Sequence, residues 1–182
     1  YIRTQADDKD VILQSDDGSG GTTAYLTLDG SETKTIVSQT MEFQDNVKLA
    51  IGNSEDMIID HNATDTRIMN YTGDLRILNV ANDKDITFES DDGGGGVSTY
   101  FYLDGSLTET NFQVRTRHVD NAQAWFGNSG DLQIYHNGTD SVIDNLTGDF
   151  YISQKAADKD LIFRADDGAG GYTPYLTLDG SA

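Results

Sequence analysis

The sequence predicts an all-β fold of short strands joined by tight hairpin turns. Short apolar stretches alternate with polar residues at a period of two, the spacing of side chains on one face of a strand. These stretches are rich in Val, Ile, Tyr, Phe and Thr, which favour strands. Asp-Gly and Asn-Gly pairs separate them and supply the backbone conformations that tight hairpins require. No segment shows a helical stripe with caps.

Residues 131–136 show the alternation clearly. Leu132, Ile134 and His136 fall on one face of the expected strand, and the two residues between them fall on the other. Turn sequences such as DDGSGG, LDGS, HNGTD and TGD follow such stretches along the whole chain. We therefore expect six or seven short strands per repeat unit, with further examples at 24–28 and 160–164.

The chain repeats itself at a constant interval. Asp10, Asp85 and Asp160 are equivalent, since 85 − 10 = 75 and 160 − 85 = 75, and no insertion interrupts the alignment. Residues 2–75 share 34 identities in 74 positions with residues 77–150. We expect two whole units and part of a third, and because the chain starts and stops inside its own repeat, a longer array. The predicted units are 1–75, 76–150 and 151–182.

The identities between the units concentrate in the turns. Asp, Gly, Asn and Ser positions are kept, whereas residues 36–44 and 111–119 share almost nothing. A scaffold keeps its turn geometry in this way and leaves one segment free to differ. An active site would usually occur once rather than in every copy, so we expect that the protein is not an enzyme and has neither catalytic nor cofactor-binding residues.

Composition excludes several classes of function. The 182 residues carry 31 Asp and Glu against 12 Lys and Arg, a formal net charge of −19. Such a charge repels phosphate backbones and anionic lipids, so we expect no nucleic-acid partner and no membrane insertion. No run of apolar residues is long enough to span a bilayer. The absence of Cys excludes disulfides and thiolate chemistry.

A single unit of such short, polar strands would be only marginally stable. Its open strand edges would also invite pairing with other chains. Stacking along the repeat axis is one solution, and winding identical chains into a symmetric oligomer is another. A long acidic array in a fibre would use both.

Two stretches carry a resemblance to a known family. They are GNSGDLQIYHNGTDSVIDNLTGDFYI at 127–152 and KDLIFRADDGAGGYTPYLTLDGS at 159–181. The sequence resembles the repeated shaft of tail-fibre or fibre-like virion proteins of marine tailed bacteriophages, especially cyanophages. The first copy departs from the pattern at residues 57–60, which read MIID where LQIY is usual. The resemblance covers nearly the whole chain.

The resemblance implies an elongated, β-rich homotrimer on the virion surface. Its expected partners are other copies of itself, other virion or tail proteins, and a host glycan or receptor bound by a tip outside this sequence. We therefore expect a structural spacer that presents a host-recognition tip. A glycan-binding adhesin that acts by avidity, a polysaccharide-degrading tailspike and a bacterial surface adhesin are the alternatives.

Acidic pairs followed by Gly recur in each unit. Two carboxylates could catalyse glycoside hydrolysis, but adjacent residues on a turn usually diverge. Asp and Asn in Gly-rich turns could also bind Ca²⁺, although no EF-hand loop is present. We favour turn chemistry, in which each Asp accepts hydrogen bonds from its own backbone. The pairs are Asp16 and Asp17, Asp91 and Asp92, and Asp166 and Asp167.

Other residues could carry chemistry, but each also has a structural interpretation. His61 and His136 are equivalent and could meet on a threefold axis to hold a metal or an anion, but we expect each to lie beside its turn without a ligand. His118 aligns with Phe43, so no role is predicted for it. Glycosylation sequons begin at Asn62, Asn70, Asn137 and Asn145, and we expect them to be turn residues. Aromatic residues could form a sugar platform, although packing is favoured: Tyr25, Tyr100, Tyr102, Trp125, Phe126, Tyr135 and Tyr175.

Overall fold

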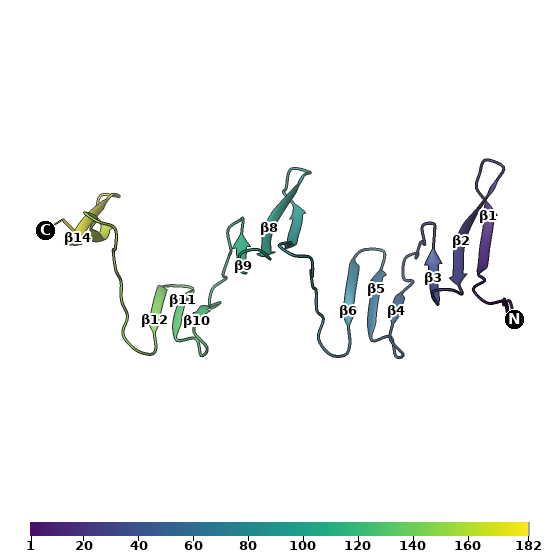
Figure 1. Ribbon diagram of the computed structural model, residues 1–182. Helices are drawn as coiled ribbons and strands as arrows, with labels where there is room; N and C mark the ends of the chain where they lie inside the picture. Colours follow the sequence, from purple (N-terminus) through teal and green to yellow (C-terminus); the bar gives the residue numbers. More distant parts are fainter. Residues whose placement is uncertain (182) are drawn as a thin grey trace. The chain divides into compact units, whose positions relative to one another are not determined.

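The computed structural model describes residues 1–181, and the all-β prediction is confirmed for them. They contain strands and no helix, and hence no helix that could cross a membrane. The chain divides into two units, one of residues 1–78 and one that begins at residue 79. Within each unit the strands form small antiparallel sheets in which every strand pairs with its neighbours in sequence (Figure 1).

The first unit contains two three-stranded sheets. β1, β2 and β3 form one sheet and β4, β5 and β6 form the other, each in sequence order. Six strands thus fall within the first predicted repeat, in the range that the sequence indicates. Their bounds are β1 Val11–Asp16, β2 Thr22–Asp29, β3 Lys34–Val37, β4 Leu49–Ile51, β5 Met57–His61 and β6 Thr66–Asn70.

The second unit contains two three-stranded sheets and one hairpin. β7, β8 and β9 form the first sheet, β10, β11 and β12 the second, and β13 pairs with β14. The bounds are β7 Ile86–Asp91, β8 Val97–Asp104, β9 Glu109–Phe112, β10 Ala124–Phe126, β11 Leu132–His136, β12 Ser141–Asn145, β13 Leu161–Asp166 and β14 Tyr172–Leu178.

The strand register recurs at the same interval as the sequence. Val11 pairs with Leu28 and Ile86 pairs with Leu103, so both partners are displaced by one repeat. Three hairpins, β1–β2, β7–β8 and β13–β14, are equivalent in the repeat. Each also has a β-bulge at the same place, where one strand carries an extra residue and the local twist increases. The bulge follows Leu13, Phe88 and Phe163.

A hydrogen bond from a backbone N–H to an Asp side chain closes the open end of each of these hairpins. The backbone N–H of Gly30 donates to Asp10 Oδ1 at 3.1 Å, and the same bond joins Gly105 to Asp85 at 3.0 Å. A Cβ on Gly30 would lie 2.5 Å from the carbonyl oxygen of Lys9, a distance that side chains do not adopt. Gly is therefore required here by the close approach of the two strands.

We expect Gly105→Ala to destabilise the second unit by roughly 1–3 kcal/mol, because its new Cβ would overlap the carbonyl oxygen of Lys84. Urea unfolding, with the change in midpoint at constant slope, measures this effect. Gly94→Ala is the matched control, because Gly94 has an ordinary φ and its counterpart in the third hairpin is already Ala169. Equal midpoints for the two variants would contradict the steric explanation.

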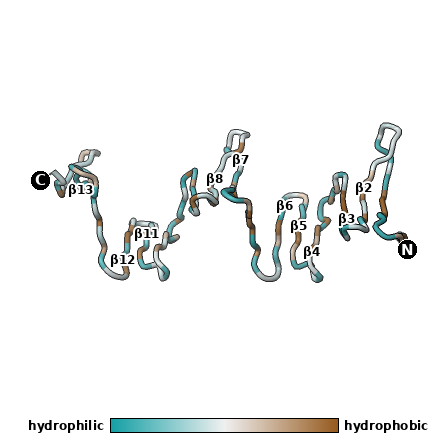
Figure 2. Tube along the Cα trace, viewed as in Figure 1, coloured by the Kyte–Doolittle hydropathy of each residue, from teal (hydrophilic) through white to brown (hydrophobic). Residues whose placement is uncertain are grey.

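The sheets have almost no hydrophobic core. Within residues 1–181, Ile58 is the only buried apolar side chain, with 3% of its surface exposed, and Asp60 is the one buried charged residue, at 8%. Figure 2 shows hydrophobic residues in short stretches all along the trace. More than three dozen large apolar side chains remain exposed, so within a single chain the sheets depend mainly on backbone pairing and on hydrogen bonds in the turns.

The exposed surface is far larger than that of a folded monomer of this size. The chain exposes 15140 Å², whereas a monomeric protein of 19.9 kDa exposes roughly 8,700 Å². The excess is roughly 6,400 Å². Burial of apolar surface is the main force that stabilises folded chains, and here most of that surface is left uncovered.

Candidate functional site

The sheet of β7, β8 and β9 has one apolar and one polar face. Phe88, Phe101 and Phe112 lie opposite one another across the three strands. The rings of Phe88 and Phe101 stack with centroids 4.4 Å apart and planes 10° apart, and the rings of Phe101 and Phe112 are 5.9 Å apart. Phe112 remains 60% exposed, so nothing in the described chain covers this face.

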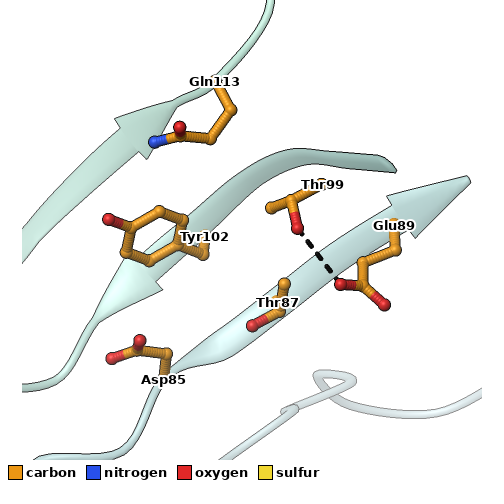
Figure 3. Close-up of a pocket in the computed structure, with 6 residues that line it drawn as sticks. All are labelled: Asp85, Thr87, Glu89, Thr99, Tyr102 and Gln113. Carbon is orange, nitrogen blue, oxygen red and sulfur yellow. Dashed lines mark hydrogen bonds between the residues drawn. The ribbon is translucent and has the colours of Figure 1, made fainter. Parts of the chain in front are cut away.

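The opposite face of this sheet forms an open polar hollow of about 380 Å³. Figure 3 shows the ring of Tyr102 flanked by Gln113 and Asp85, with Thr99 and Glu89 at the other end. Thr99 Oγ1 donates to Glu89 Oε1 at 3.1 Å, which fixes that carboxylate. The hollow is lined by Asp85, Thr87, Glu89, Thr99, Tyr102 and Gln113.

This combination of side chains occurs in one sheet only. The first sheet keeps a carboxylate at Asp10, the equivalent of Asp85, but has Gln14 in place of Glu89 and Thr27 in place of Tyr102, so it lacks both the aromatic ring and the second carboxylate. The sequence predicts divergence between the units at 36–44 and 111–119. The structure adds a second variable surface, which combines side chains of β7 and β8 with residues just outside the strands and is therefore not visible as a linear motif.

Within each acidic pair, the second Asp accepts hydrogen bonds from its own turn. Asp17 Oδ1 lies 2.8 Å from the backbone nitrogen of Ser19 and 3.0 Å from that of Gly21, and these donors lower the pKa of the carboxyl. Asp92 and Asp167 make the equivalent bonds, and their pKa values are lowered for the same reason. Within residues 1–181, no three acidic or His side chains gather as a metal-binding group.

Acid is expected to unfold these turns only below the ordinary Asp pKa of 3.8. A carboxyl whose pKa is lowered by folding contributes stability above that value, and the contribution is lost as the pH falls through the lowered pKa. An acid titration followed by far-ultraviolet circular dichroism measures the transition. Replacing Asp17, Asp92 and Asp167 by Asn keeps the acceptor oxygen, so we expect a shallower transition with unchanged structure at pH 7; an unaltered transition would contradict this role.

His61 and His136 each use Nδ1 to accept a hydrogen bond within their own turn, from the backbone nitrogen of Ala63 at 3.3 Å and of Gly138 at 3.2 Å. The same atom of His61 lies 3.0 Å from Oδ1 of Asp45, which precedes β4, and that of His136 lies 2.9 Å from the carbonyl oxygen of Asp140. His118, for which the sequence predicts no role, lines one hollow of about 450 Å³ together with His136. The other residues that line this hollow are mostly apolar, and none of them is a carboxylate or a Cys.

The aromatic residues that could have formed a sugar platform are divided between sheets. Trp125 lies against Gly130, where a Cβ would meet the ring at 2.7 Å, and its Nε1 donates to Gln123 Oε1 at 2.6 Å. Its neighbour Phe126 takes the opposite face of β10. The hydroxyl groups of the other aromatic residues mostly bond locally: Tyr100 to Asp91, Tyr135 to Asp144 and Tyr175 to Asp166. Among these candidate aromatic residues, Tyr102 lies beside a polar hollow.

The Asn residues of the four sequons also bond within turns. Asn62 Oδ1 accepts from the backbone nitrogens of Thr64 and Asp65, at 3.0 and 2.7 Å. Asn70 Nδ2 donates to the carbonyl oxygens of residues 72 and 73. Asn137 and Asn145 repeat these two arrangements in the second unit.

One ion pair was not visible in the sequence. Asp60, the buried carboxylate, receives two bonds from Arg67, Nε to Oδ1 at 2.9 Å and Nη2 to Oδ2 at 2.7 Å. Arg67 thereby lowers the pKa of Asp60. In the second unit Tyr135 and Val142 occupy these positions, so the pair belongs to one sheet only and supports that sheet rather than a repeated chemistry.

Comparison with known proteins adds no relative. No family model matches the chain, and neither a curated protein nor a solved structure does. The function proposed below therefore rests on the geometry of the chain and on the resemblance of its sequence to tail-fibre shafts. Two surfaces stand out in that geometry, namely the uncovered apolar faces of the sheets and the polar hollow around Tyr102.

Proposed function

We propose that the chain is a structural segment of a fibre, built from tandem repeat units and completed by other copies of itself. The observation that carries this proposal is the uncovered apolar surface. An excess of roughly 6,400 Å² per chain is several times the area that one partner contributes to a standard interface. A chain of this kind gains most of its stability on association.

The repeated register supports the tandem architecture. Three hairpins share the same pairing, the same bulge and the same Gly–Asp bond at the interval of the sequence repeat. Because the units resemble one another, identical chains aligned in parallel and in register would make similar contacts in every unit. Rotational symmetry closes such an assembly, so no single unit needs an interface of its own kind.

The number of chains and the setting come from the resemblance to tail fibres. In this proposal the segment is a homotrimeric spacer on the outer face of a virion, and it carries a host-recognition tip. Its action is mechanical, with no substrate turnover and no resident cofactor. The net charge of −19 per chain limits association between neighbouring fibres.

Light scattering on a size-exclusion column tests the proposal. We expect a mass three times the 19.9 kDa of one chain at neutral pH, with or without EDTA. A mass of one chain would contradict self-association and would favour an adhesin with independent units. A trimer that dissociates in EDTA would keep the fibre but add calcium as a structural ligand of the acidic turns.

Glycan binding is a second candidate function, favoured by the hollow of Figure 3. An aromatic ring beside carboxylate, amide and hydroxyl groups is the combination that stacks on a sugar and bonds its hydroxyls. A panel of host-type polysaccharides immobilised on a surface provides the test. Binding that is abolished by Tyr102→Ala and retained by Trp125→Ala would support this function. If the wild-type chain binds no polysaccharide of the panel, glycan binding is excluded as its function.

A further inference from the structure

The two faces of the hairpin sheets differ in how similar their residues are from one repeat to the next. Four positions on one face, which we call the apolar face, are apolar in all three hairpins. On the opposite face the equivalent residues vary in size and in charge; Gln14, Glu89 and Arg164 occupy one and the same position there. The apolar face comprises Val11, Leu13, Leu26 and Leu28; Ile86, Phe88, Phe101 and Leu103; and Leu161, Phe163, Leu176 and Leu178.

We propose that the apolar face is the surface through which copies of this chain contact one another. The proposal rests on the self-association proposed above and names its location. Strands β3 and β9 extend the face with Val37 and Phe112, which are 46% and 60% exposed in the single chain. The chain does not cover these side chains itself, although they are its most regularly repeated apolar group.

Charge favours this face over the opposite one. Each chain carries a net charge of −19, so identical chains repel one another at long range. Like charges placed together in an interface cost several kcal/mol, and a contact between copies must therefore exclude them. The twelve positions of the apolar face contain no ionisable residue, whereas the opposite face of β7 carries Glu89 beside the polar hollow.

The shape of the face suits side chains of another copy. In the first unit Ile2 and the four residues of the apolar face line a hollow of about 140 Å³ that is almost entirely apolar. In the second unit the face is aromatic instead, because the rings of Phe88 and Phe101 stack and the ring of Phe112 lies beside them, tilted by 31° from that of Phe101. Aromatic and branched aliphatic groups of this kind form the centre of stable interfaces.

A second copy is a better occupant than an unrelated protein. The face recurs once in every repeat, and an identical chain in register is the one partner that necessarily has the same interval. Contact at every hairpin would cover area on the scale of obligate oligomers. Pairing through strand edges would not cover these side chains, because edge pairing leaves both faces of a sheet open.

Adjacent residues of β8 provide a matched pair of variants. Phe101 lies on the apolar face and Tyr102 on the polar face, and both are half-buried aromatic residues. We expect Phe101→Glu to reduce the solution mass to that of one chain under conditions in which the wild type is oligomeric, and Tyr102→Glu to keep the wild-type mass. Light scattering measures both, and circular dichroism shows whether each variant keeps its strands.

A second pair decides the question if Phe101→Glu does not fold. Phe112 and Asn111 are neighbours at the end of β9 and lie on opposite faces of the sheet. Because Phe112 is exposed in the single chain, a charge at this position does not disrupt the pairing of the strands. Dissociation by Phe112→Glu but not by Asn111→Glu supports the inference. If Phe112→Glu leaves the wild-type oligomer intact, or if Asn111→Glu and Tyr102→Glu dissociate it, the inference about the apolar face is wrong and the proposed function still stands. A monomeric wild type overturns both.

Discussion

A hundredfold dilution of the protein is expected to lower the temperature at which its strands melt. For a trimer that unfolds to three chains, this dilution changes the free energy of unfolding by about 5 kcal per mole of trimer, because two additional particles are released. The apolar faces and the large exposed area of the single chain are the structural reason for this coupling. Strands and assembly should then be lost together.

Thermal melts followed by circular dichroism at several concentrations measure the effect. A dimer would give about half of the change, and a chain that is stable alone would give none. The dependence on concentration therefore reports the number of chains without reference to shape. Coincident melting temperatures at all concentrations would show that each hairpin sheet is stable by itself, in conflict with its nearly absent core.

Phe88→Ala is expected to destabilise the assembled protein by about 3–5 kcal/mol per chain, the cost of removing a buried aromatic side chain. In a single chain Phe88 is 38% exposed and its main loss would be one stacked pair, which is worth only about 0.5–1.5 kcal/mol. The size of the effect thus distinguishes a covered face from an uncovered one. Urea unfolding at a fixed protein concentration gives the value.

Phe150→Ala is the control for this variant. Phe150 is 50% exposed and lies outside the strands, so its removal should change the free energy of unfolding by less than about 1 kcal/mol. Equal small effects of the two substitutions would show that the Phe88 face stays open to solvent. Equal large effects would show that the contact between copies extends over the connecting segments.

The strands and their faces could be predicted because they depend on local pattern. In residues 131–136 the alternation placed Leu132, Ile134 and His136 on one face, and the pairing of Leu132 with Asn145 and of Ile134 with Ile143 confirms the register. The turn residues were equally visible, since Asp17 and Asn62, for example, bond to backbone groups within four residues. Such bonds need no information from distant parts of the chain.

The bulges, the ion pair and the polar hollow could not be predicted in the same way. Asp60 and Arg67 meet because of the particular offset between β5 and β6, which the sequence does not state. The hollow around Tyr102 combines side chains from two strands and from Gln113, which follows β9. The positions of the candidate aromatic residues could not be predicted either: Trp125 and Phe126 are adjacent in sequence but take opposite faces of β10.

The consecutive pairing of the strands has a consequence for the order of events after synthesis. Every ladder joins neighbours in sequence, and in the first sheet the most distant partners are Val11 and Leu28. Pairing over such short separations forms in microseconds to milliseconds. In the proposed assembly, association of chains is slower at cellular concentrations, so the newly formed strands of a single chain keep their apolar side chains in water and gain their stability only later. A chaperone or a templating neighbour would have its greatest effect in that interval.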